Sequence, residues 1–358
     1  MSAAAGAAAA GEGAGRALPG RRPLPLALAL AFLACSALAG LLVGPVDLGL
    51  GPVARDVASR LPFLGVDSHL SGADSAILWQ LRAPRVVLGA LVGGMLALAG
   101  ASYQGVFRNP LADPYLLGIA AGAGLGATLA ITWGHGAVGT YDLIPLAAFA
   151  GGAAGVVAAY ALGHTASTGR STASLILAGV TVTSFLTAIQ TFVQQQHSDS
   201  LQEVYSWILG HLDTAGWHDV ALVAPYVGAS ALVLLLHRRV LDVLSLGDEE
   251  AATLGVNVAR TRLVVVAFAT VGTAAAVAIS GLIGFVGIIV PHAIRLALGP
   301  SYRLILPLSL VGGAGFLVLA DVIARTVMAP AELPIGVVTA FFGAPFFAIV
   351  LRTSRSFT

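Results

Sequence analysis

The chain has 358 residues, of which 57% are hydrophobic and only 10% charged, whereas soluble domains carry about 25% charged residues, so it cannot cover a water-facing globular surface. Its net charge of +1 gives no indication of nucleic-acid binding, and its single cysteine, Cys35, excludes an internal disulfide and a cysteine-based metal cluster. All eighteen basic residues are arginine, and because a P-loop requires a lysine for the nucleotide phosphates, the chain is not a Walker-type ATPase.

The apolar segments predict an all-α polytopic membrane protein with about ten transmembrane helices. A transmembrane β-barrel would instead show alternating strands of about ten residues. Residues 1–23 are rich in Ala and Gly and predict a disordered cytoplasmic tail, and residues 24–355 are expected to form a single transmembrane domain. The predicted spans are 24–44, 83–104, 112–133, 142–163, 172–194, 219–237, 262–282, 284–298, 303–324 and 335–351.

Two of the predicted spans differ from the others, one by a possible cleavage site and one by its short length. The first, 24–44, contains ALAG at 37–40, which resembles a signal-peptide cleavage site. Because the run is long enough to cross a bilayer and more spans follow, we favour a retained helix. The segment 284–298 is shorter than the roughly 20 residues that a spanning helix needs.

The arginines between the spans predict the orientation. With the N-terminus inside, ten of them lie on the cytoplasmic side: Arg108, Arg170, Arg238, Arg239, Arg260, Arg262, Arg295, Arg303, Arg352 and Arg355. Only five lie outside: Arg55, Arg60, Arg82, Arg85 and Arg325. Positive charge accumulates on the cytoplasmic side of membrane proteins, so both termini are expected in the cytoplasm.

One short charged segment, GDEEAATLGVNV at 247–258, interrupts the apolar sequence on the cytoplasmic side. Its three acids suit the first turn of a helix, where they meet the positive end of the helix dipole. Gly247 and Gly255 are placed to begin and end that turn. The pattern indicates a compact helix along the membrane face, with a small apolar side that suits docking into a groove, although a solvated loop has a similar composition.

Several long motifs together resemble the FecCD family, the permease subunits of ABC importers for vitamin B12, ferric siderophores and haem. The similarity covers about residues 24–355. The motifs are LRAPRVVLGALVGGMLALAGASYQGVFRNPLADPYLLGIAAGAGLGA at 81–127, LILAGV at 175–180, LGDEEAATLGVNVARTR at 246–262, GLIGFVGIIVPHAIRL at 281–296, LADVIAR at 319–325 and AELPIGVVTAFFGAPFFAIVL at 331–351. The last is especially similar to the vitamin B12 permease.

The resemblance implies a ten-helix subunit paired with a second copy or a close paralogue around one pathway. Two separate ATPases would bind the cytoplasmic face, and an extracytoplasmic binding protein would dock outside. Coupling to the ATPase is implied for a loop at about 246–259, by Gly247, Asp248, Glu249, Ala252, Leu254, Gly255 and Val256. Docking of the binding protein is implied for Arg82, Arg85 and Arg325, whose alternative role is to reach lipid headgroups.

The resemblance also implies two cytoplasmic constrictions of the pathway. One lies at Asn109 and Leu111, the other at Thr172 and Ala173, where the vitamin B12 permease has a serine in place of Ala173. A helix cap is the simpler role for Thr172. In the span that follows, a polar stripe at helical spacing is expected to line the pathway or to bond to other helices: Thr183, Thr187, Gln190 and Gln194.

These observations predict a permease subunit that imports a metal chelate by alternating access, with ferric siderophore favoured over cobalamin and haem. It is expected in a bacterial plasma (inner) membrane, surrounded by lipid, with no enzyme activity, bound cofactor or metal of its own. ATP and Mg would be used by the partner ATPase. The alternative is an ion-coupled secondary transporter, which would need buried acids along a pathway, and here only Asp321 lies in an apolar span.

Overall fold

The described part of the chain is built of helices, several of them long and apolar enough to span a membrane, which confirms the all-α polytopic fold. The computed structural model describes residues 23–60, 70–134, 140–165 and 172–354. Within them, seven helices are long and apolar enough to span a membrane and three further apolar helices are shorter. The predicted tail at 1–23 lies outside the described residues except for Pro23.

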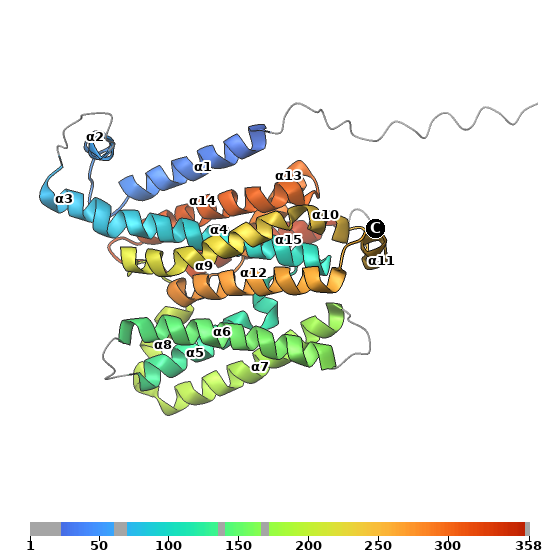
Figure 1. Ribbon diagram of the computed structural model, residues 1–358. Coiled ribbons are helices and arrows are strands. Elements are labelled where there is room, and N and C mark those ends of the chain that lie inside the picture. The colour runs from blue at the N-terminus through green and yellow to red at the C-terminus, as the bar shows by residue number, and fades with distance from the viewer. Residues whose placement is uncertain (1–22, 61–69, 135–139, 166–171, 355–358) are drawn as a thin grey trace, which may run out of the picture.

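The helices that follow the ten predicted spans keep close to the expected limits. They are α1 (Pro23–Leu42), α4 (Ala83–Phe107), α5 (Ile119–Trp133), α6 (Thr140–Thr165), α7 (Thr172–Gln196), α9 (Trp217–Leu236), α12 (Val258–Ser280), α13 (Val286–Leu298), α14 (Tyr302–Thr326) and α15 (Ile335–Ser354). They run roughly side by side along one direction (Figure 1), so the two ends of the molecule are distinct.

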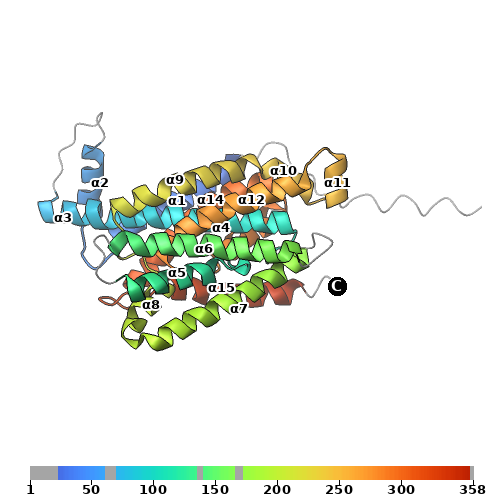
Figure 2. The ribbon, with the colours of Figure 1, turned by 60° about the horizontal axis from the view of Figure 1, so that its bottom comes forward.

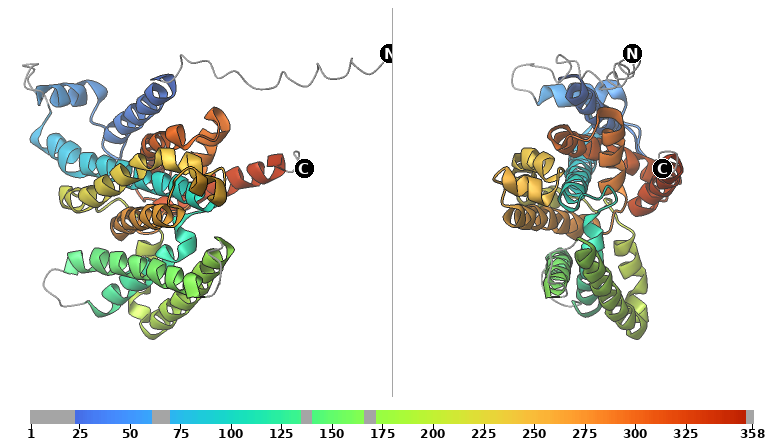
Figure 3. Two further views of the ribbon diagram at one scale, coloured as in Figure 1. Left: turned by 45° about the vertical axis from the view of Figure 1, so that its right-hand side comes forward. Right: turned by 90° about the vertical axis from the view of Figure 1, so that its right-hand side faces the viewer.

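The centre of the bundle is α4. It contacts α1, α9, α12, α13 and α14, and 83% of its most apolar window is buried, against 11% for α1 and 17% for α7. Helix α15 packs on α13 and α14, whereas α5, α6 and α7 pack on one another and form a second group below the first in Figure 1. The view along the bundle in Figure 3 separates this green group from the others. The largely exposed faces of α1 and α7 are therefore available to lipid or to another chain.

Two helices are short because the chain before them is not α-helical. The span expected from 112 begins as an irregular segment, with α5 starting only at Ile119, and a second irregular segment precedes α13. The two segments meet where the Tyr115 hydroxyl donates to Ile283 O and accepts from Ile283 N–H, both at 3.1 Å. Non-helical backbone is tolerated at membrane depth only where it is enclosed by protein, and this pairing supplies that enclosure.

Shorter helices precede or connect these ten helices. They are α2 (Leu50–Ser59), α3 (Gly72–Ala76), η1 (Ile77–Arg82), η2 (Pro114–Leu117), η3 (Ser198–Ser200), α8 (Leu201–Ile208), α10 (Arg238–Leu244) and α11 (Asp248–Thr253). Figure 2 places α2 and α3 at one end of the bundle and α11 at the opposite end. This matches the orientation in which α11 and the C-terminus face the cytoplasm.

Close packing at the centre of the bundle depends on Gly100. A Cβ at this position would lie 1.9 Å from Gly287 O on α13, which is backbone and cannot turn away. We expect Gly100→Ala to lower the free energy of unfolding by about 1–3 kcal/mol, because α4 and α13 must separate. Thermal unfolding of the purified protein measures this. Gly228→Ala on α9, where a Cβ meets nothing within 4 Å, is the control, and equal effects of the two substitutions would contradict the packing argument.

Candidate functional site

The acidic segment folds as the short helix α11 between two glycines, as predicted. Gly247 has φ 141° and Gly255 has φ 83°, conformations that L side chains adopt only with strain. At its end, the Gly255 N–H donates to Ala252 O at 2.9 Å and the Val256 N–H donates to Ala251 O at 3.0 Å. This pair of bonds is a Schellman motif, which satisfies the last carbonyls and stops the helix at a defined residue.

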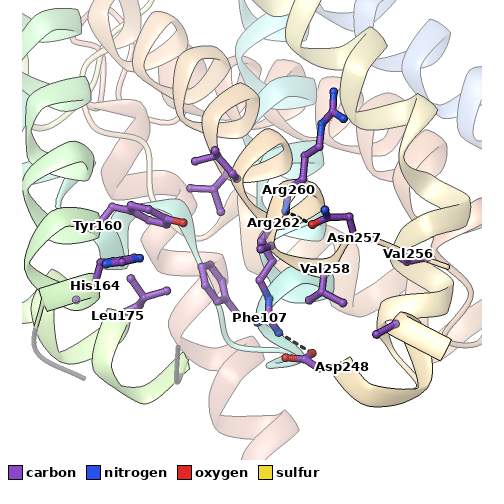
Figure 4. A pocket seen from close by; sticks show the side chains of 15 residues that line it. Phe107, Tyr160, His164, Leu175, Asp248, Val256, Asn257, Val258, Arg260 and Arg262 are labelled. Atoms are coloured by element: carbon purple, nitrogen blue, oxygen red, sulfur yellow. Dashed lines mark hydrogen bonds and ion pairs between the residues drawn. The ribbon is translucent and has the colours of Figure 1, made fainter. Parts of the chain in front are cut away.

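Asp248, the first residue of α11, connects this helix to two others. Its carboxylate lies 2.8 Å from Arg262 Nη2 on α12 (Figure 4) and 3.5 Å from Arg108 Nη2. Arg108 follows α4 with a left-handed backbone, φ 49°. A carboxylate is also favoured at the first turn of a helix. One shared carboxylate therefore links α11 to the ends of α4 and α12.

The preceding helix, α10, is fixed in a similar way by Asp242. This carboxylate accepts hydrogen bonds from the Tyr302 N–H at 2.5 Å and from the Ser301 hydroxyl at 3.1 Å, and lies 3.2 Å from Arg303 Nε. These three residues begin α14. The α10–α11 segment thus contacts the cytoplasmic ends of three spans, α4, α12 and α14.

The outward side of α11 is small and partly apolar. Ala252 and Glu249 are exposed, and Leu254 is 64% exposed. Val256, by contrast, packs against the hydrophobic core beside the fully buried Ala251. The expected apolar contact surface therefore includes Ala252 and Leu254 but not Val256, whose side chain anchors the segment. Docking of a partner on this surface stays a prediction.

At the opposite end of the bundle, Arg82 points inward. It is 5% exposed and donates to Leu41 O and Leu42 O, each at 2.8 Å, and to Val46 O. The last carbonyls of a helix have no partner within it, and a cation also suits the negative end of the helix dipole. Arg82 therefore closes the C-terminal end of α1.

Arg85 and Arg325 form an ionic network with two carboxylates. Arg85 lies 2.7 Å from Asp321 and 2.8 Å from Glu332. Arg325 lies 3.5 Å from Asp321 and donates to Gly40 O on α1 at 2.7 Å. Arg325 thus neutralises Asp321 from one helical turn away, and Arg85, distant in sequence, is the closer partner of this carboxylate.

Two of the three arginines expected to contact the binding protein are buried in this structure, and their docking role stays a prediction. Arg82 is 5% and Arg325 3% exposed, because their guanidinium groups satisfy carbonyls of α1 and the Asp321 carboxylate. Arg85 retains 12% side-chain exposure beside the more accessible Glu332, at 34%. Snorkelling to headgroups is wrong for Arg82 and Arg325 for the same reason.

The first predicted constriction lies in the irregular segment after α4. The Asn109 side chain accepts from the Leu111 N–H at 2.9 Å, and the Asn109 carbonyl accepts from the Ala112 N–H at 3.0 Å. Leu111 is 43% exposed. The second constriction lies at the start of α7, where the side chains of Thr172 and Ala173 fall outside the described residues.

The polar stripe of α7 does not form one surface. Gln190 is buried and its Nε2 donates to Thr128 on α5 at 3.2 Å, so it joins two helices, which is one of the two expected roles. Thr187 is exposed, and Thr183 and Gln194 are half-buried. The predicted stripe does not include two further exposed hydroxyl residues of α7, Thr181 and Thr191. Each donates a hydrogen bond to a backbone carbonyl one helical turn earlier.

The sequence analysis also missed the partners of several charges. Three charged residues form interactions between helices that are distant in sequence: Arg262, Arg108 and Asp242. In the sequence alone, each resembles an ordinary charged residue of a loop. The α10–α11 segment is thus held to three spans at one end of the polytopic bundle, and a buried ionic network lies at the other.

Comparison with known proteins identifies the family. The FecCD transport family matches residues 30–353, and the chain belongs to it. It is 45% identical over 280 residues to the cobalamin import system permease protein of Halobacterium salinarum, covering 77% of this chain and 73% of that protein. It is 38% identical over 291 residues to the hemin transport system permease protein of Yersinia pestis, covering 78% and 84%.

A solved structure supports the fold. A chain assigned to a metal-chelate type ABC transporter, in an inward-facing conformation, superposes with a TM-score of 0.80 at 28% identity, covering 92% of this chain and 99% of that one. The protein is therefore a multi-pass permease of the plasma (inner) membrane.

The buried network predicts a large effect of removing one charge. Asp321→Asn leaves Arg85 and Arg325 without their carboxylate, and we expect the free energy of unfolding to fall by about 3–5 kcal/mol. Arg303→Gln, which removes a pair whose arginine is 62% exposed, is the control and should cost about 1 kcal/mol or less. Thermal or denaturant unfolding distinguishes the two. Similar losses in both variants would show that the Asp321 network does not behave as a buried one.

Proposed function

We propose that α11 is the element through which a separate ATPase drives this permease. The observation that carries the proposal is the attachment of α11: Asp248 pairs with Arg262 and Arg108, while Leu254 projects outward at 64% exposure. A partner that binds the exposed side of α11 would move the ends of α4 and α12. ATP and Mg would be bound by that partner, since this chain has no lysine for a P-loop.

The proposed cargo is a metal chelate. Relatives named for cobalamin, hemin, ferric citrate and ferric hydroxamate import support this class. Within it, the sequence alone favours ferric siderophore, but identity is 45% with the cobalamin permease and 38% with the hemin and ferric-citrate permeases. We therefore propose cobalamin as the first ligand to test, ahead of ferric siderophore and haem.

The proposed assembly contains a second copy of the chain or a close paralogue, with the pathway between them. Large aromatic side chains on α7 and α15 support this arrangement, since Phe185, Phe192 and Phe341 are 63–79% exposed. We propose that five residues line the pathway: Thr183, Thr187, Gln194, Asn109 and Leu111. At the outer end we propose that Arg85, accessible beside Glu332, contacts the binding protein, and that Arg82 and Arg325 hold α1 in place.

The coupling proposal predicts a specific loss of activity. In Leu254→Asp, a charge replaces the exposed apolar contact, so ATP-driven uptake should fall at least about tenfold, as expected for an interface hot spot. The melting temperature should stay unchanged, because the side chain is exposed. Leu298→Asp at the end of α13, 40% exposed at the same end of the bundle, is the matched control. Uptake that survives Leu254→Asp would contradict the role of α11.

The cargo is tested by uptake into vesicles that contain the chain, its candidate ATPase and its candidate binding protein. Radiolabelled cobalamin, ferric siderophore and haem are compared, each with and without ATP. We expect ATP-dependent accumulation of one ligand, with cobalamin the first candidate. Accumulation that follows an ion gradient and persists without the ATPase would instead indicate the ion-coupled secondary transporter.

A further inference from the structure

The helix α2 lies across the outer end of the bundle, whereas the spans run along it. In Figure 2, α2 is roughly perpendicular to the spans, and Figure 1 shows it nearly end-on beside the outer end of α1. A helix in this orientation is parallel to the plane of the membrane. What it contacts therefore depends on its depth and on the residues of its exposed face.

The depth of α2 follows from its contacts with the end of a span. Val53 of α2 is buried and forms a small apolar cluster with Leu78 of η1. Leu41 and Leu42, the last residues of α1, pack against the same cluster. Because α1 has 20 residues, about the length that crosses the hydrocarbon core, its last turn marks the boundary of that core. Helix α2 therefore lies where hydrocarbon meets headgroups.

Two tryptophans support the same depth. The Trp79 indole N–H donates to Asp56 Oδ2 on α2 at 2.6 Å, and the Trp217 indole N–H donates to Trp79 O at 2.8 Å. Trp217 is the first residue of the span α9. Tryptophan is enriched where a membrane meets water, because its ring is apolar and its N–H needs a partner. Asp56 thus connects α2 to residues at interfacial depth.

The exposed side of α2 carries an apolar strip. Leu50 is 60% and Val57 36% exposed, and Ala54 between them is also exposed. Their spacings of four and three residues place them on one side of the helix. Val43 and Val46, just before α2, are exposed as well, so the strip continues the apolar surface of α1. Acyl chains would remove this continuous surface from water, which is favourable.

Exposed arginines lie beside the apolar strip. Arg55 is exposed and lies about 140° around the helix from Leu50, at 3.6 residues per turn. The Arg60 side chain is 54% exposed, and its guanidinium carbon lies 4.3 Å from the centre of the Trp79 ring. Both arginines are on the outer side, where the positive-inside rule does not explain them. Guanidinium groups bind phosphates well, and lipid phosphates lie at the depth of α2.

We propose that α2 is an interfacial helix that lies in the outer leaflet, with Leu50 and Val57 among the upper acyl chains and Arg55 at the lipid phosphates. An apolar strip beside basic residues, on a helix parallel to the membrane, is typical of such helices. Because Asp56 accepts from Trp79, the lipid contact of α2 sets the depth of η1 and of Arg85, which follows it. The proposal is independent of the cargo and of the role of α11.

The test measures the depth of a fluorescent label on α2 in the full-length protein. Cys35→Ser removes the single cysteine, and Leu50→Cys or Val57→Cys then carries a polarity-sensitive fluorophore. The protein is placed in nanodiscs of palmitoyl-oleoyl phosphatidylcholine with a spin-labelled lipid whose quencher lies just below the headgroup. Interfacial helices bury their apolar face about 5–10 Å into this region, so both labels should be quenched at least about threefold more than a control label.

The matched control is Ala73→Cys, an exposed alanine on α3. Figure 2 shows α3 projecting beyond the ends of the spans, so its label should be quenched mainly by iodide in the water. Because Leu50 and Val57 are exposed, both variants should keep the melting temperature of the parent protein, and either one alone suffices for the test.

Three outcomes would overturn the proposal. One is equal lipid quenching at all three labelled positions, and another is quenching of the two α2 labels by iodide but not by the spin-labelled lipid. The third is shielding of the α2 labels from iodide only after a candidate binding protein is added, which would identify a protein contact surface instead.

Discussion

A backbone N–H or carbonyl within hydrocarbon has no water to bond, and this constraint decides where the chain can leave its helices. The segment before α5 and the segment before α13 depart from α-helical geometry, and they meet through the Tyr115 hydroxyl and the Ile283 backbone. The exposed carbonyls at the end of α1 are bonded by Arg82. The irregular parts of the bundle are therefore enclosed, and α4 can pass through its centre with glycine contacts as close as Gly100 against Gly287.

Because of the same constraint, the charged residues at the two ends of the bundle differ in burial and in role. At the outer end, Arg85 and Arg325 enclose Asp321 and also reach Glu332 and α1, so the charges consolidate the bundle. At the cytoplasmic end, Asp248 is 41% exposed and connects a small accessible helix to its neighbours. A buried network resists change, whereas an accessible ion pair adjusts at low cost. This difference suits a transporter that receives a mechanical input at one end.

The sequence by itself determined the spans, the orientation and the place of α11. Hydropathy over about 20 residues, arginine placement and glycines beside an acidic turn are local properties, and a bilayer imposes strict requirements on them. Only the tertiary structure decided the partners of the charges and which face of α7 is exposed. Arg85 and Asp321 are 236 residues apart, and Gln190 is buried because α5 presents Thr128 to it. Such pairings depend on how helices pack, and the periodicity of a single helix carries no information about its neighbours.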